Sequence, residues 1–243
     1  MSPDSETQVV LVEFHGIEPR NSLTVLAKRL PQQRVHVWDV LTEDVLSADS
    51  LSTFAAGLIA SNPIDAAPLA IVGSCFGAQL VTACAAQWQS RATGPVLAVT
   101  IDPVVISEEV LQSQARSLAT RVGADLSSSG VTTEDWLDHV LARLRLGAVR
   151  QAVADGDDPT DAQDVADLLV RHYRLWLRYL WLCRYDRSSA HVSAVLSEAA
   201  QADGAPVDEV LRLGSFVDTS DVLTSDELVG WVLRAPTTRE GAA

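Results

Sequence analysis

The sequence predicts an α/β fold built on a mostly parallel, doubly wound sheet. Short apolar runs rich in β-branched residues alternate with helical stretches through the first hundred residues. This alternation is typical of strands that are joined by crossover helices and buried on both faces. The chain has 243 residues, of which 47% are hydrophobic, so it is long enough for one domain with a sizeable core.

Four strands are expected in this first part, and each has the apolar run of a buried strand. They cover residues 8–14, 34–40, 68–74 and 95–101. Helices are expected between them, over residues 22–30, 51–61 and 76–89. Asn21 can cap the first helix, and Asn62-Pro63 stops the second. The repeated order of strand and helix predicts parallel strands with covered faces.

The pattern changes after the fourth strand. Residues 107–187 contain no convincing strand, and helices are expected over 109–121, 133–145 and 160–182. We interpret this block as a helical insertion, placed as a lid over the strand ends, within a single domain of residues 1–243. The chain then returns to the sheet through two more strands and a helix, over residues 191–196, 209–213 and 225–233.

Charge and composition narrow the possible partners. The net charge is −14, which argues against nucleic acid and anionic membrane surfaces. No apolar run is long enough to span a membrane and no signal region is evident, so we expect a soluble, cytoplasmic protein. Cys75, Cys84 and Cys183 are too few for a disulfide scaffold, and no pair has metal-ligand spacing. We expect no bound metal.

The third strand runs directly into Gly73-Ser74-Cys75-Phe76-Gly77, and a helix follows. This layout predicts a nucleophile elbow, with Cys75 in the place that serine usually takes. Gly73 and Gly77 would let neighbouring backbone pass close to the tight turn. The N-terminus of the next helix favours a thiolate. The alternative is a buried cysteine in a turn that happens to contain two glycines.

Asp102 ends the strand that follows the elbow helix. Because the carboxyl ends of neighbouring parallel strands meet at one edge of the sheet, this carboxylate can face Cys75. We therefore expect Asp102 to act in the catalytic site. The alternative is that Asp102-Pro103 is a turn that simply ends a strand.

With these features the chain resembles the thioesterase family of polyketide and nonribosomal peptide pathways, within the α/β-hydrolase superfamily. The resemblance is carried by the segment 10–16, the elbow 73–77, Asp102, the helical insertion and the segment 210–216. It implies an α/β-hydrolase fold with a helical lid. It also implies an oxyanion hole formed by the backbone N–H groups of Phe76 and Ile17, with Gly16 allowing close approach.

The family's implied work is transfer of an acyl or aminoacyl group from a carrier-protein thioester to the nucleophile, and then to water or another acceptor. The expected partner is an acyl or peptidyl carrier protein, whose phosphopantetheine arm presents the substrate, and the chain needs no cofactor of its own. The expected setting is specialised metabolism, such as antibiotic biosynthesis.

This sequence departs from the family where the catalytic histidine would lie. The last loop has Phe216 at that position. None of the five histidines of the chain is a strong candidate for the base; they are His15, His36, His139, His172 and His191. A cysteine can act without a strong base because its pKa is near 8.5. Cys75 without a histidine is thus similar to the aminoacyl shuttles of this superfamily, although hydrolysis stays open.

Three other interpretations remain. The chain can be a catalytically silent, thioesterase-like binding partner of a carrier protein or synthase, or an unrelated small-ester hydrolase. Dienelactone hydrolases also carry Gly-x-Cys-x-Gly, but later in the chain and without a large helical block.

Within the helical insertion of this chain, the aromatic stretch 173–182 can line an acyl tunnel or serve only in core packing.

Overall fold

The computed structural model describes residues 7–15, 17, 22–64, 69–90, 96–126, 133–186, 192–196, 209–211 and 218–234. These residues form two compact units. The sheet unit falls within residues 1–40, 48–105 and 186–243, and the helical unit comprises 41–47 and 106–185. The insertion expected at 107–187 overlaps the second of these units, which also includes the separate segment 41–47.

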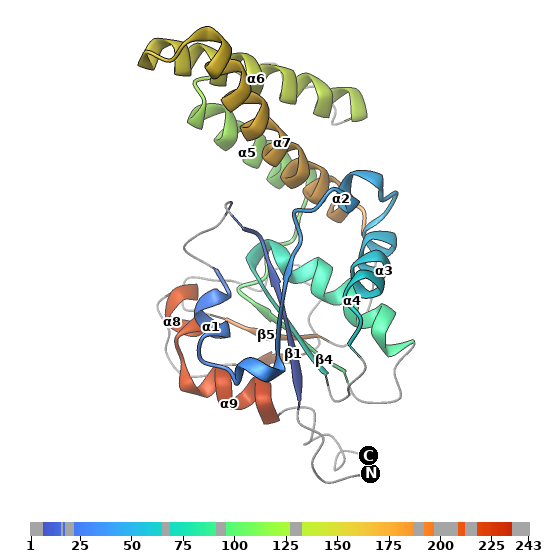
Figure 1. The fold of residues 1–243 in the computed structure, drawn as a ribbon. Coiled ribbons are helices and arrows are strands. Elements are labelled where there is room, and N and C mark those ends of the chain that lie inside the picture. Colours follow the sequence, from blue (N-terminus) through green and yellow to red (C-terminus); the bar gives the residue numbers. More distant parts are fainter. Residues whose placement is uncertain are drawn as a thin grey trace. The chain divides into compact units, whose positions relative to one another are not determined.

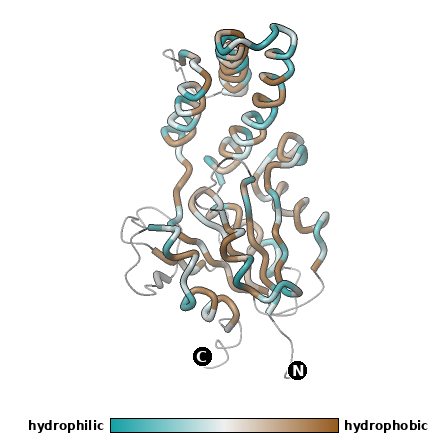
Figure 2. Tube along the Cα trace, turned by 60° about the vertical axis from the view of Figure 1, so that its left-hand side comes forward, coloured by the Kyte–Doolittle hydropathy of each residue, from teal (hydrophilic) through white to brown (hydrophobic). Residues whose placement is uncertain are grey.

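The sheet unit is built on six parallel strands. In order across the sheet they are β2 (Val35–Asp39), β1 (Gln8–Glu13), β3 (Leu69–Ser74), β4 (Val96–Ile101), β5 (Val192–Val195) and β6 (Glu209–Leu211). Every residue of β3, β4 and β5 is buried, and Figure 2 shows brown, hydrophobic colour along the strands. Because both faces are covered, these strands are mostly apolar along their whole length rather than alternating, and their polar residues Ser74, Thr100 and Ser193 are buried as well.

Helices cover the two faces of the sheet, on opposite sides in Figure 1. On one side lie α3 (Leu51–Ser61) and α4 (Ala78–Gln89), which pack together. On the other side α1 (Thr24–Ala27), α8 (Thr219–Leu223) and α9 (Asp226–Arg234) surround a buried apolar cluster that includes Leu11, Leu26 and Leu228. This arrangement confirms the predicted doubly wound sheet.

Some helix boundaries differ from the sequence prediction. The first helix, expected over residues 22–30, is only four residues long. Ser22 lies before it, and its hydroxyl donates to the buried carboxylate of Glu13 at 3.0 Å. Asn21, the expected cap, lies outside the described residues. The short helices α2 (Asp44–Ser47) and α8 were not predicted, since four or five residues carry too little periodicity to detect.

The helical unit contains α5 (Glu108–Arg121), α6 (Glu134–Asp155), α7 (Pro159–Cys183) and α2. Side chains of Ser107, Thr133 and Asp158 cap the three long helices, and Pro159 begins α7 where its missing N–H costs nothing. Gly156 ends α6 with a φ of 105°, a left-handed cap. Arg145 and Asp167 form an ion pair between α6 and α7.

No helix in the described parts of the chain is long and apolar enough to cross a membrane.

Candidate active site

Cys75 lies at a sharp turn between β3 and α4. Its backbone has a φ of 47°, in the left-handed region that a residue with a side chain rarely adopts. Cys75, Phe76 and Gly77 form one 3-10 turn that continues directly into α4, and the Cys75 side chain is 8% exposed. A strained residue at a strand-to-helix turn has the local geometry of a nucleophile elbow.

The two glycines of the elbow allow this turn to pack closely. A Cβ atom on Gly73 would lie 2.6 Å from Cγ2 of Val81 on α4 and 3.2 Å from the carbonyl oxygen of Gly77. A Cβ atom on Gly77 would lie 3.3 Å from the Phe14 ring. Backbone therefore lies close to Gly73, as predicted, whereas the atoms nearest to Gly77 belong to side chains.

The sheet register brings Cys75 and Asp102 to the same edge. Ser74 pairs with Ile101 across β3 and β4, so Cys75 and Asp102 are the next residues on neighbouring strands. The loop after β4 also contacts the elbow, because the Val104 N–H donates to the Cys75 carbonyl oxygen at 3.1 Å. Asp102 has a φ of 46° and a side chain that is 7% exposed.

Asp102 has a buried partner that was not predicted from the sequence. The hydroxyl of Thr219, the first residue of α8, donates to Asp102 Oδ2 at 2.6 Å, and both side chains are buried. Thr219 lies in the segment 213–221, which the family resemblance identifies as the loop that carries a histidine. Phe216, the position singled out from the sequence, lies outside the described residues. The only hint of this contact in the sequence was that the loop contains no histidine, which leaves the carboxylate of Asp102 open to another partner.

The predicted oxyanion donors are only partly described. Phe76 is the middle residue of the 3-10 turn and 8% exposed. Ile17 is buried, and its N–H donates to the Phe14 carbonyl oxygen at 3.4 Å. Gly16 lies outside the described residues. The role of both N–H groups in an oxyanion hole stays a prediction. To take this role, the Ile17 N–H would have to release the Phe14 carbonyl oxygen and donate to the substrate oxygen instead.

The four described histidines have different surroundings. His15 follows β1, and its Nδ1 lies 3.6 Å from Asp39 Oδ1 at the end of β2, with both side chains about half exposed. His36 on β2 hydrogen-bonds with Gln8 at 3.1 Å. His139 and His172 belong to the helical unit, where Nε2 of His172 is buried without a hydrogen-bond partner among the described residues. His191 lies outside the described residues.

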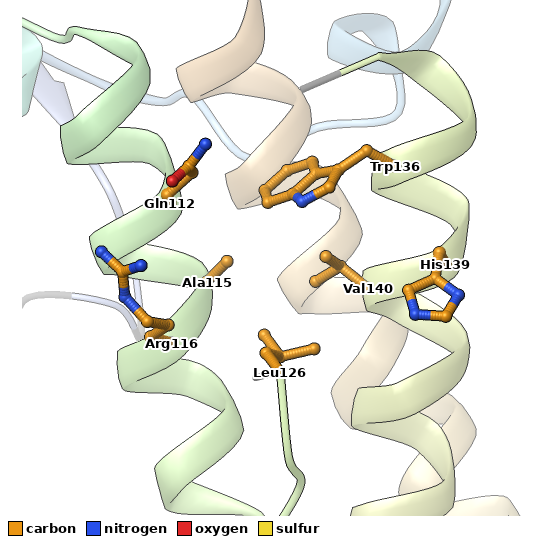
Figure 3. Close-up of a pocket in the computed structure, with 7 residues that line it drawn as sticks. All are labelled: Gln112, Ala115, Arg116, Leu126, Trp136, His139 and Val140. Atoms are coloured by element: carbon orange, nitrogen blue, oxygen red, sulfur yellow. The ribbon is translucent and has the colours of Figure 1, made fainter. Parts of the chain in front are cut away.

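The helical unit contains a small pocket of its own, shown in Figure 3. Gln112, Ala115 and Arg116 reach it from α5, and Trp136, His139 and Val140 reach it from α6. The aromatic stretch of α7 does not line this pocket. Seven of its ten side chains are buried, and Trp176 stacks on Tyr179 with ring centroids 5.9 Å apart. These contacts favour the core-packing interpretation of that stretch.

The cysteines differ in chemistry. Cys84 lies inside α4, and complete burial raises the pKa of its thiol from 9.0 to about 12. Cys183 is also buried, near the end of α7. Cys75 alone is placed at a strained turn and next to a helix N-terminus.

In the described parts of the chain, no cluster of three or more His, Cys, Asp or Glu side chains has the arrangement of a metal site.

Comparison with known proteins gives a match in structure but not in sequence. No protein-family model matches the chain, and no curated protein matches it. The fold is similar to the NocB thioesterase domain in covalent complex with a fluorophosphonate nocardicin G analog, at 15% identity over 95% of this chain and 94% of that one, with a TM-score of 0.50.

A second similar structure is the Vlm2 thioesterase domain with genetically encoded 2,3-diaminopropionic acid bound with a dodecadepsipeptide. It has 15% identity and a TM-score of 0.51, and the match covers 94% of this chain and 92% of that one. At this level of identity the likeness concerns the fold. Together with the parallel sheet, it establishes an α/β-hydrolase fold of the type found in thioesterase domains.

Proposed function

We propose that this chain is a thioesterase-like acyl or aminoacyl transferase that acts on carrier-protein-bound thioesters through Cys75. The observation that carries the proposal is the left-handed backbone of Cys75 between β3 and α4. Such strain costs about 1–3 kcal/mol and persists where the surrounding structure requires it, which is characteristic of catalytic nucleophiles. The similarity of the fold to thioesterase domains supports the same class of reaction.

In the first step the Cys75 thiolate attacks the carbonyl carbon of the carrier thioester. The phosphopantetheine sulfur leaves and takes up the proton that Cys75 released, so one thioester replaces another. Backbone N–H groups of Phe76 and Ile17 would stabilise the oxyanion that forms during attack. In the second step an acceptor thiol loses its proton, attacks the acyl group, and returns the Cys75 thiol.

The contact at Asp102 favours transfer to a thiol over hydrolysis. The hydroxyl of Thr219 occupies Oδ2 of this carboxylate, and a hydroxyl cannot take up a proton from water at neutral pH as an imidazole does. A water molecule needs a general base, which typically contributes about 10²–10⁴-fold to the rate. An acceptor thiol has a pKa near 8.5 and supplies thiolate without that help.

The proposal is tested by mixing the protein with acyl- and aminoacyl-loaded carrier proteins and measuring intact masses. We expect a mass increase equal to the acyl group, located at Cys75 by peptide mapping and absent from Cys75→Ala. Cys183→Ala is the matched control and should load as the unaltered protein does. Binding of a carrier without any adduct would instead support the silent binding partner, and an adduct at another residue would reject the elbow.

A further inference from the structure

The Thr219–Asp102 hydrogen bond joins two buried side chains that are 117 residues apart in sequence. The donor is the Thr219 hydroxyl and the acceptor is Oδ2 of the carboxylate, at 2.6 Å. This distance is at the short end of the range for O–H···O hydrogen bonds in proteins. The hydrogen bond attaches the start of α8 to the carboxyl edge of the sheet.

Asp102 is in a backbone conformation that needs external support. Its φ of 46° is left-handed, and Pro103 follows it. A residue before proline is restricted to extended conformations by contact with the proline ring, so the local sequence opposes this turn. Strained backbone of this kind persists only where surrounding contacts require it. The Asp102 N–H donates to the Val195 carbonyl oxygen at 2.9 Å, and the Thr219 hydroxyl holds the side chain.

The turn at residues 102–104 also contacts the elbow at Cys75. Two residues after Asp102, the Val104 N–H donates to the carbonyl oxygen of Cys75 at 3.1 Å. The backbone of Cys75 is left-handed as well, and this hydrogen bond is one contact that holds its carbonyl group. A continuous series of contacts thus runs from the Thr219 hydroxyl, through the Asp102 turn and Val104, to the backbone of Cys75.

We propose that Thr219 is a positioning residue for Cys75. By holding the Asp102 carboxylate, its hydroxyl keeps the 102–104 turn in place, and that turn keeps Cys75 in its reactive orientation. The inference rests on the proposed function, because it assigns a role in orienting the nucleophile named there. It also gives Asp102 a part in the site that requires no histidine.

The test measures alkylation of Cys75 by iodoacetamide, in which the thiolate displaces iodide, as a function of pH. This reaction needs no carrier protein, so the inference can fail or hold independently of the proposed function. Three variants are compared with the unaltered full-length chain. Thr219→Val removes the hydroxyl at nearly constant volume, Thr219→Ser keeps it, and Thr224→Val removes an exposed hydroxyl bond at the end of the same helix.

We expect Thr219→Val to lower the limiting rate of Cys75 alkylation at high pH by about tenfold or more, since small displacements of a reacting group have effects of this size. Thr219→Ser should recover most of that rate, and Thr224→Val should leave it unchanged. An unchanged rate in folded Thr219→Val would overturn the proposal. So would a loss in Thr219→Ser equal to that in Thr219→Val, because the lost methyl group would then be the cause.

If Thr219→Val does not fold, a second pair of variants decides. Asp102→Glu keeps the charge but moves the carboxylate by one methylene group, away from the position that Thr219 bonds. A reduced alkylation rate in Asp102→Glu together with a normal rate in Thr219→Ser supports the positioning role. A normal rate in Asp102→Glu, or a reduced rate in Thr219→Ser, rejects it.

Discussion

Gly73 and Val81 are packed so closely that any side chain at position 73 would overlap α4. The ideal Cβ position on Gly73 is 2.6 Å from Val81 Cγ2, which belongs to a fully buried side chain. β3 and α4 are joined by only three residues, so neither can move far without changing the turn that holds Cys75. The closeness of the strand and the helix is therefore part of the elbow itself.

We predict that Gly73→Ala destabilises the protein by about 1–3 kcal/mol, the usual cost of overpacking a core. Urea unfolding gives the free energy of unfolding directly. Gly57→Ala in α3 is the matched control, because its added Cβ has no atom within 4 Å, and it should be neutral or stabilising by about 0.5–1 kcal/mol. Equal stability of Gly73→Ala and the unaltered protein would contradict the packing argument.

We predict that Cys75 is alkylated by iodoacetamide much faster than Cys84 in the folded protein. Cys84 is fully buried and its pKa is raised to about 12, so almost no thiolate forms there at pH 8. Peptide mapping after short exposure measures both sites in one sample. In denaturant the two rates should become similar, which serves as the control. Comparable reactivity in the folded state would exclude a special environment at Cys75.

The raised pKa of Cys84 predicts a loss of stability at alkaline pH. The unfolded chain releases the thiol proton near pH 9, whereas the folded chain keeps it until about pH 12. The folded state therefore binds more protons over this interval, and the free energy of unfolding falls as pH rises from about 9 to about 12. Below pH 9 the thiol is protonated in both states, so it does not change the free energy of unfolding as pH varies.

The measurement compares the unaltered protein with Cys84→Ala, since tyrosines and lysine also titrate at alkaline pH. The stability of both should be followed between pH 8 and 10.5. We expect a steeper decline for the unaltered protein. Parallel curves would mean that the Cys84 thiol ionises in the folded state as easily as in the unfolded chain.

We predict that an acyl group on Cys75 persists in buffer and is discharged by an added thiol or free carrier protein. The reason is that the last loop, residues 213–221, contains no histidine, so water lacks the base that the family resemblance places there. Intact mass spectrometry over time measures the adduct with and without the acceptor. Fast loss of the adduct in buffer alone would show that hydrolysis has a base.

In that case the first variant to examine is His15→Gln. Among the described histidines, His15 lies at the carboxyl edge of the sheet, after β1 and beside Asp39. His36→Gln is the control, because His36 lies within β2 and bonds to Gln8. Slower loss of the adduct in His15→Gln alone would identify the base, whereas equal rates in both variants would move the search to the other histidines.

Much of the sheet and elbow could be predicted from the sequence because their signals are local. The strands β1, β3 and β4 are short, largely apolar runs, and the helix α3 ends where the following Asn62-Pro63 indicate. Gly73 and Gly77 on either side of Cys75 indicate a close turn from the sequence alone. The shared edge of Cys75 and Asp102 follows from the general geometry of parallel strands.

The sequence alone thus determined the fold class, and it predicted the strand-to-helix turn at Cys75 and the shared sheet edge of Cys75 and Asp102. Only the tertiary structure decided what holds that carboxylate, and which unit the segment 41–47 joins. Thr219 and Asp102 are separated by 117 residues, and Glu43 bonds to Arg171 on α7 at 2.7 Å across a similar separation. Such contacts depend on how whole elements pack, and no local pattern of residues encodes them.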